Sequence, residues 1–406
     1  MMFQSENGRS DIDLNKFYSD ENSGRLHMPT TFFWGSGFIR NIPNLVNSRS
    51  VEVFIDGIVA EQMDLSWIDE LNISNLHRTY GTPWVEDVEE YIEENPQNPE
   101  CALVIGGGST ADFAKGVIAR RAYGEISELG VGKRSGAQVA KSALPEIVGV
   151  PTTIGSGAES SRYFVLYEKA TKAKVHGKSW ALVASTVVVD PDLLRNLPPQ
   201  VAISSAFDSF VHYWESLICK HESTFATRMF SKHGIAEVII NLKRVLQDSS
   251  DLEAWTNLGL NASLAGTAIS NTRTGNIHEA AGALLERVNL SHGETLMVFA
   301  QSAYDQYMTE TSTLLDNTVQ QSGLVDFQSA LNWWNELFEK YGMINKISRE
   351  LNLILDLDEA RQHIFKRVSN DKVWVNKESP IGYGDALIRD LIDEGFSKFL
   401  TDLVVS

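Results

Sequence analysis

The sequence predicts an α/β region with a parallel sheet in its N-terminal half and an all-helical region in its C-terminal half. Ten of the eleven prolines occur at or before Pro199, and residues 200–379 contain none. Because proline disrupts a helix interior, the proline-free stretch favours long helices. Before Pro199, short β-branched runs alternate with helix-like segments, as in a parallel sheet covered by helices on both faces. The runs are Val51–Ile55, Ala102–Ile105, Ile147–Val150 and Val187–Val189.

The border between the two regions is expected near residues 190–199, where Asp-Pro and Pro-Pro pairs interrupt both patterns. We therefore expect an α/β domain at 29–194 and an all-helical domain at 195–406. The segment before them, residues 1–28, is polar and carries no readable motif.

The charge and cysteine content exclude several classes of protein. The net charge of −18 disfavours binding to nucleic acid or to an anionic lipid surface. No apolar run approaches the roughly 20 residues of a membrane span, and the polar N-terminus lacks the pattern of a secretory signal. Cys101 and Cys219 are the only cysteines, which fits a reducing compartment. We expect a cytoplasmic protein that acts on a small molecule, with neither nucleic acid nor membrane as a partner.

A glycine-rich turn follows the second β-branched run. Ala102–Ile105 leads through Gly106, Gly107, Gly108 and Ser109 into a helix-like segment. Free backbone N–H groups and the positive end of a helix dipole at such a turn suit a pyrophosphate, and this would make the domain Rossmann-like. The alternative is a tight turn whose glycines serve only its geometry, because neither standard dinucleotide nor P-loop fingerprint is present.

Two further segments favour the nucleotide interpretation. Residues 150–159, VPTTIGSGAE, also place hydroxyl groups and glycines after an expected strand. Asp56 ends the first run, where a carboxylate can accept hydrogen bonds from a ribose and would repel a 2′-phosphate, so NAD is expected rather than NADP. The alternative for Asp56 is a turn cap.

Four side chains form a candidate metal site. Asp208 and His212 are four residues apart within a helical apolar pattern, so they lie one turn apart on one helix face. Such a pair can hold a cation, although it also occurs as an ordinary salt-bridged or solvated face. His278 and His292 follow later in the chain. One carboxylate and three imidazoles suit Fe(II), Zn(II) or a similar divalent ion.

The order of these motifs resembles the iron-containing (group III) alcohol dehydrogenases, whose dehydroquinate synthase-like fold is shared with glycerol dehydrogenase. The resemblance extends from residue 33 to residue 293 and includes GGGSTADFAK, PTTIGSGAES, VVVDPDLLRNLPP and LAGTAISN. It implies a dinucleotide-binding domain at 29–194 and a metal-binding domain at 195–406. The implied metal ligands, which are also the catalytic centre, are Asp208, His212, His278 and His292. The implied nucleotide contacts are Asp56, Gly107, Gly108, Ser109, Asp112, Thr152, Thr153, Ser161 and Lys174.

The sequence departs from the family pattern in three places. Many members carry a further histidine four residues after the third ligand, where it assists proton transfer, but here that position is Gly282. Water or a ribose hydroxyl is therefore expected to relay the proton. The family's GTGSE reads GSGAE here. Residues 271–275, NTRTG, are similar to members that reduce phosphonoacetaldehyde. Arg273 could pair with an anionic substrate group, and its alternative is a surface or capping arginine.

The resemblance implies a metal-dependent, NAD(H)-linked alcohol dehydrogenase or aldehyde reductase. Its expected substrate is a small aldehyde or primary alcohol, anionic if Arg273 faces the cleft. The expected cofactors are NAD(H) and one divalent metal, with Fe2+ favoured and Zn2+ as the alternative, and the expected assembly is a homodimer or higher homo-oligomer. A sugar-phosphate cyclase of the dehydroquinate synthase type and a glycerol-like polyol dehydrogenase stay open. The cyclase needs converging cations, and near His278 and His292 the sequence offers only Arg273 and Arg287. A non-catalytic binding role is disfavoured because no metal ligand is missing.

Overall fold

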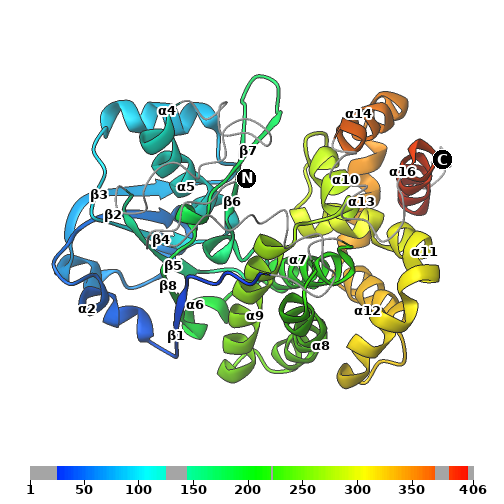
Figure 1. Cartoon of the computed structure of the whole chain (residues 1–406), viewed down its shortest axis with the longest axis horizontal. Helices are drawn as coiled ribbons and strands as arrows, with labels where there is room; N and C mark the ends of the chain where they lie inside the picture. Colours follow the sequence, from blue (N-terminus) through cyan, green and yellow to red (C-terminus); the bar gives the residue numbers. More distant parts are fainter. Residues whose placement is uncertain (1–24, 125–143, 221–222, 371–383, 401–406) are drawn as a thin grey trace, which may run out of the picture.

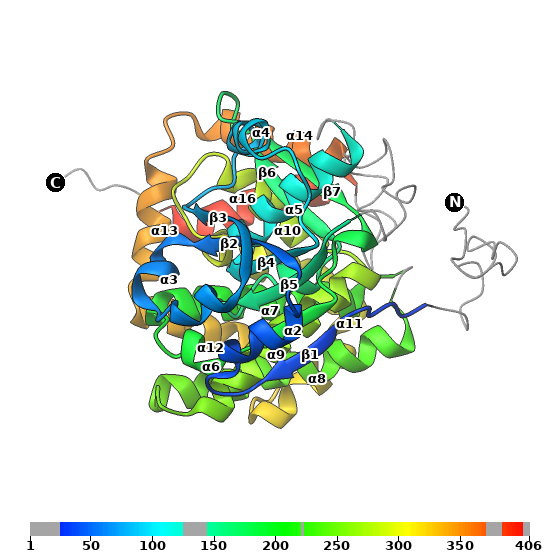
Figure 2. The ribbon, with the colours of Figure 1, turned by 90° about the vertical axis from the view of Figure 1, so that its left-hand side faces the viewer.

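The computed structural model describes residues 25–124, 144–220, 223–370 and 384–400. Most of the expected polar segment at 1–28 lies outside these residues. A six-stranded parallel sheet forms one side of the molecule and a set of helices forms the other (Figure 1). Figure 2 views the molecule from the sheet side, with the C-terminal helices behind. The predicted fold class is therefore confirmed.

The sheet runs in the order β1-β8-β5-β4-β2-β3, and every neighbouring pair is parallel. A separate antiparallel hairpin is formed by β6 and β7. The strands are β1 (Thr31–Trp34), β2 (Ser50–Asp56), β3 (Asn72–Thr79), β4 (Cys101–Gly106), β5 (Glu146–Pro151), β6 (Tyr163–Tyr167), β7 (Lys174–Lys178) and β8 (Thr186–Val189).

Helices cover the sheet and then make up the rest of the described chain. The α-helices are α2 (Ile42–Val46), α3 (Gly57–Gln62), α4 (Val85–Glu94), α5 (Gly108–Tyr123), α6 (Pro191–Leu194), α7 (Pro199–Ile218), α8 (Phe225–Gln247), α9 (Leu252–Asn271), α10 (Asn276–Leu285), α11 (His292–Val319), α12 (Phe327–Lys340), α13 (Met343–Asn352), α14 (Leu357–Asn370) and α16 (Asp385–Phe399). The 3-10 turns are η1 (Phe38–Asn41), η2 (Ser66–Glu70), η5 (Ala158–Ser160), η6 (Trp180–Leu182) and η7 (Gln320–Ser322). None of the described helices is both long and apolar enough to cross a lipid bilayer.

The four predicted β-branched runs lie within β2, β4, β5 and β8, the four inner strands of the sheet. Their side chains alternate between two faces, as strand geometry requires. On one face Val53 and Leu103 join the cluster that contains Trp67, and on the other Phe54 and Val104 join the core shared with the C-terminal helices. The edge strands β1 and β3 were not predicted, because β1 is only four residues long and β3, NISNLHRT, is mostly polar.

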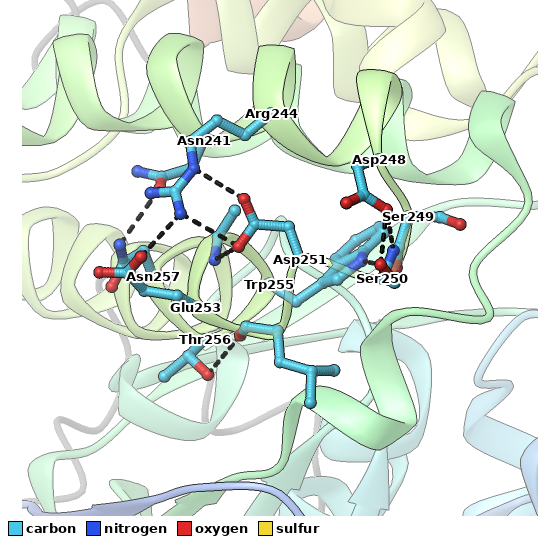
Figure 3. A network of polar contacts seen from close by, with 12 residues as sticks. Asn241, Arg244, Asp248, Ser249, Ser250, Asp251, Glu253, Trp255, Thr256 and Asn257 are labelled. Carbon is cyan, nitrogen blue, oxygen red and sulfur yellow. Dashed lines mark hydrogen bonds and ion pairs between the residues drawn. The ribbon is translucent and has the colours of Figure 1, made fainter.

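The corner between α8 and α9 is held by a polar network (Figure 3). Asp251 caps α9 by accepting a hydrogen bond from the Ala254 N–H, 3.0 Å away. Arg244 donates from Nε to Asp251 at 2.8 Å and from Nη2 to Glu253 at 2.7 Å. The indole of Trp255 donates to the Ser249 carbonyl. The network thus fixes the angle at which α9 leaves α8 and returns toward the sheet.

The β5–β6 loop meets α9 at unusually close range. Gly157 has a φ of +54°, and a Cβ built there would lie 2.1 Å from the Ala262 carbonyl oxygen. A Cβ at Gly266, on α9, would lie 2.1 Å from the Gly157 carbonyl oxygen. Buried Glu159 in the same loop accepts a hydrogen bond from Ser263 Oγ. Gly157 in GSGAE and Gly266 on α9 therefore bring the loop backbone into direct contact with the helical region.

We expect Gly266→Ala to lower the free energy of unfolding by about 1–3 kcal/mol, because the added methyl group overpacks a backbone contact. Urea unfolding followed by circular dichroism measures the change. Gly282→Ala is the matched control, also a helix-interior glycine, where the new Cβ meets only the flexible Lys174 side chain at 3.4 Å. The control should be neutral or slightly stabilising. Equal midpoints for the two variants would contradict the packing argument.

Candidate active site

A cavity of about 1000 Å³ lies between the sheet domain and the C-terminal helices. Its walls come from the N-terminus of α5, the β5–β6 loop, the β6–β7 hairpin, and helices α7, α10 and α11. All four expected metal ligands line it, and so does Arg273. The cavity therefore brings together elements that are far apart in the sequence.

The four candidate ligands converge on one point. Asp208 Oδ1 lies 3.6 Å from His212 Nε2, 3.3 Å from His278 Nε2 and 3.7 Å from His292 Nε2. Suitable ligand atoms of Asp208, His278 and His292 all lie within 4.8 Å of one another. The set fits a metal ion in both geometry and chemistry, because ligands about 2.0–2.1 Å from a tetrahedral cation are separated by roughly 3.3–3.4 Å.

Each ligand is placed by the local fold of its segment. Asp208 and His212 lie one turn apart on the buried helix α7, as the spacing predicted. His278 lies in the first turn of α10. His292 is the first residue of α11, which begins with a capping box: Ser291 accepts from the Glu294 N–H, and Glu294 accepts from the Ser291 N–H. The His292 side chain is 36% exposed, against about 7% for His278 and Asp208, so the site opens toward the cavity on this side.

The charges in the site favour a bound cation. Burial alone would raise the pKa of Asp208, but the surrounding imidazoles hold it below its ordinary value, so the carboxylate stays ionised. Burial lowers the pKa of His212 to about 4 and that of His292 to about 3. Burial also disfavours the charged form of His278, but Glu215 together with Asp208 raises its pKa to about 9. A divalent cation would replace that proton, because an imidazole binds metal in its neutral form.

Glu215 is a functional residue that the sequence analysis missed. Its carboxylate accepts a hydrogen bond from His278 Nδ1 at 2.6 Å, from the Gly275 N–H at 2.7 Å and from the Ile277 N–H at 2.8 Å. The side chain is 1% exposed. A carboxylate on Nδ1 holds the hydrogen there and leaves Nε2 free to bind metal. The sequence feature that could have pointed to Glu215 is its spacing, because residues 208, 212 and 215 share one face of α7.

The expected nucleotide contacts fall into two groups. Gly108, Ser109, Asp112, Thr153, Ser161 and Lys174 line the cavity, whereas Asp56, Gly107 and Thr152 do not. Gly107 is the N-cap residue of α5, so the helix begins at the glycine-rich turn as predicted. A Cβ on Gly107 would lie 3.0 Å from Thr153 Cγ2, and this shows how closely the β4–α5 and β5–β6 loops pack. Thr152 is buried, and its N–H donates to the Gly106 carbonyl.

Asp56 lies at the carboxyl end of β2, next to the end of β4 in the sheet. Its Oδ1 accepts hydrogen bonds from the Ile58 N–H at 2.9 Å and from the Val59 N–H at 3.1 Å. The alternative role as a cap is therefore present, at the start of α3. Both bonds use Oδ1, so the cap does not occupy Oδ2.

Two charged residues of α5, buried Lys115 and half-buried Asp112, lie next to the cavity. Lys115 donates to the backbone carbonyls of Ala158, Ser161 and Tyr163, and thereby fixes the loop that carries Ser161. Burial raises the pKa of Asp112 to about 7, although the ammonium groups of Lys115 and Lys174 oppose the shift. No role for Lys115 was predicted from the sequence, because it contacts backbone carbonyls that are distant in the chain.

The chain matches the family model for iron-containing alcohol dehydrogenase over residues 29–191, and the model for the C-terminal part of the same family over residues 202–347. It belongs to the iron-containing alcohol dehydrogenase family. This family is one of oxidoreductases, so the expected enzyme class is confirmed.

Relatives of known name agree with this assignment. The 1,3-propanediol dehydrogenase of Klebsiella pneumoniae is 29% identical over 197 residues, which are 48% of this chain and 49% of that protein. The match thus spans about half the length of this curated relative. An iron-containing alcohol dehydrogenase from Thermococcus thioreducens has the same fold, with a TM-score of 0.76, 19% identity and coverage of 92% of this chain and 100% of that one. A sulfoacetaldehyde reductase from Bifidobacterium kashiwanohense in complex with NAD+ gives the same TM-score and identity, with coverage of 92% and 99%.

We expect Glu215→Gln to weaken metal binding by about 10–100-fold. The amide would turn a donor toward His278 Nδ1 and so favour the tautomer whose hydrogen lies on Nε2, where it blocks the metal. Equilibrium dialysis with Zn(II) measures the affinity. Glu279→Gln is the matched control, because it removes one charge from the same cavity wall on α10. Unchanged Zn(II) affinity in a folded Glu215→Gln protein would contradict the assigned role.

Proposed function

We propose that the protein is a metal-dependent, NAD(H)-linked dehydrogenase that interconverts a small aldehyde and its primary alcohol. The observation that carries this proposal is the shared cavity. Asp208 and the three imidazoles lie in the same cavity as Gly108 and Ser109, at the positive end of helix α5. Metal and dinucleotide can therefore reach the same substrate.

Residues of this chain would bind both the metal ion and the dinucleotide. Asp208, His212, His278 and His292 would hold one divalent cation, Fe2+ preferred and Zn2+ as the alternative, and that cation supplies Lewis acidity. Bound NADH supplies a hydride. Backbone N–H groups at the start of α5 would bind the pyrophosphate, and the free Oδ2 of Asp56 would accept from the adenosine ribose and disfavour NADP. The other expected nucleotide contacts would complete this surface: Gly107, Asp112, Thr152, Thr153 and Ser161. Lys174, also expected there, lines the same cavity from β7.

The position of Arg273 favours an anionic substrate. It lies in the loop between α9 and α10 and lines the cavity together with His278. A guanidinium there can form two parallel hydrogen bonds to a carboxylate, sulfonate or phosphonate. The similarity to a sulfoacetaldehyde reductase agrees with a short aldehyde that ends in an acidic group, and phosphonoacetaldehyde is a candidate of the same kind.

A sugar-phosphate cyclase is the second candidate, and one observation favours it. The cavity is lined by Lys172, Lys174 and Lys178 in addition to Arg273 and Arg287. Only the two arginines were predicted from the sequence, because the lysines belong to the β6–β7 hairpin, about a hundred residues earlier. Arg287 is paired with Glu359, and the lysines lie on the sheet-domain wall. A glycerol-like polyol dehydrogenase uses the same metal set and is separated by the assay below.

The deciding experiment measures NADH consumption by protein that has been stripped of metal and reloaded with Fe(II) or Zn(II). Neutral aldehydes, sulfoacetaldehyde and phosphonoacetaldehyde are assayed with NADH, glycerol with NAD, and a phosphorylated sugar with catalytic NAD. We expect metal-dependent net oxidation of NADH with an aldehyde, and none with His278→Ala. Turnover of the sugar phosphate without net change in NADH would establish the cyclase instead.

We expect Arg273→Ala to raise the KM for phosphonoacetaldehyde by about 10–100-fold, since a lost hydrogen bond between charged groups costs about 1.5–3 kcal/mol. The KM for propionaldehyde should change less than about twofold. Steady-state kinetics with both aldehydes gives the comparison. Arg287→Ala is the matched control, because Arg287 also lines the cavity and its guanidinium forms an ion pair with Glu359. Equal losses with charged and neutral aldehydes would show that Arg273 has a structural role only.

A further inference from the structure

Gly282 leaves a gap in the face of α10 that carries a metal ligand. It follows His278 by one helical turn and lines the cavity. A Cβ built at Gly282 would have only the Lys174 side chain within 4 Å, with Nζ at 3.4 Å. The absence of a side chain at 282 thus admits the end of Lys174 to the metal-binding side of the cavity.

Lys174 reaches this position from the opposite wall. Lys174, His176 and Lys178 alternate along β7 and all line the cavity. The Lys174 N–H donates to the carboxylate of Glu286, the C-cap residue of α10, at 3.4 Å, which ties the start of β7 to the end of this helix. Within the part of the chain that the structure describes, no hydrogen bond or ion pair engages Lys174 Nζ. Its three donors are therefore available to a bound molecule.

The groups that face Lys174 belong to both halves of the proposed site. They are Asp112 on α5, Tyr167 on β6, His176 on β7 itself, Glu286 at the C-cap of α10 and His292 on α11. The ammonium charge stabilises the ionised form of Asp112 and disfavours the protonated form of His292. Asp112 is an expected nucleotide contact and His292 an expected metal ligand. Lys174 therefore lies between the expected dinucleotide site and the expected metal site.

We propose that Lys174 Nζ donates the proton that completes aldehyde reduction, and accepts it in alcohol oxidation. In reduction the carbonyl carbon gains the hydride of NADH, the C=O π pair moves to oxygen, and that oxygen takes a proton from the ammonium. The neutral amine then regains a proton from solvent in the cavity. This inference rests on the proposed function, and it assigns a proton donor where Gly282 cannot provide one.

The first test separates proton transfer from binding. Lys174→Met should lower kcat for aldehyde reduction by about 100-fold, the lower end of what a positioned acid contributes, with a small change in KM. NADH affinity, measured by fluorescence titration without turnover, should change less than about threefold. Lys178→Met is the matched control, because it removes the same charge from the same face of β7. The control should keep kcat within about twofold.

The second test follows the proton directly. Competitive acetylation with mass spectrometry gives the pH at which Lys174 Nζ loses its proton in the free protein. The pH dependence of kcat/KM reports ionisable groups of the free enzyme. In the wild type, kcat/KM should change slope at the pH found by acetylation. In Lys174→Met, this change of slope should be absent.

The third test supplies a proton donor from the other wall. Gly282→His in the Lys174→Met background should recover at least about tenfold of the lost kcat. In this double variant the pH at which kcat/KM changes should also move toward about 6.5, the ordinary pKa of an imidazole. Lys174→Met/Gly282→Ala is the control, because it fills the same backbone position without a titratable group.

Several results would overturn the inference while the wild type still reduces aldehydes. They are a loss in Lys174→Met that lies wholly in NADH affinity, an equal loss in Lys178→Met, and a kinetic break that differs from the pH found by acetylation. The first of these would make Lys174 a cofactor contact and leave the proton to water or a ribose hydroxyl. A correctly metallated wild type that reduces no aldehyde would overturn the proposed function, and this inference with it.

Discussion

The Glu215 carboxylate joins the two helices on which the candidate metal centre depends. A buried carboxylate is costly unless its oxygens are satisfied, and here three donors from the start of α10 satisfy it. Two of them are backbone N–H groups at the beginning of α10, so the same side chain positions the helix and orients His278. His212 and Asp208 lie one and two turns earlier, respectively, on the same face of α7. The position of the candidate metal centre therefore depends on the buried carboxylate of Glu215.

The second constraint is the close approach of the sheet domain to α9. Gly157 and Gly266 let backbones touch where any side chain would separate them, and Glu159 adds a buried hydrogen bond to Ser263. This contact sets the width of the cavity between the start of α5 and the metal ligands. Nucleotide and metal sites on separate domains can act on one molecule only if that width is maintained.

The cavity is much less acidic than the chain as a whole. The protein carries a net charge of −18, whereas the cavity lining has six lysine and arginine side chains against five aspartates and glutamates. Lys174 on β7 and Arg273 before α10 would attract an anionic ligand there. The glycine at 282 leaves room for the end of Lys174 on the side of the candidate ligand His292.

Local sequence was sufficient for the inner strands, the glycine-rich start of α5 and the Asp208–His212 pair, because each depends on neighbours within a few residues. The sequence also placed His278 and His292 beside that pair as candidate ligands, and the family resemblance implied the full set of nucleotide contacts, which stay predictions. Edge strands β1 and β3 were not predicted, because β1 is only four residues long and β3 is mostly polar. The roles of Glu215, Lys115 and Lys174 required the tertiary structure, since their partners lie from about 40 to more than 100 residues away in the chain. A sequence records which groups are present and how neighbours repeat, whereas only the packed fold decides which distant groups share one cavity.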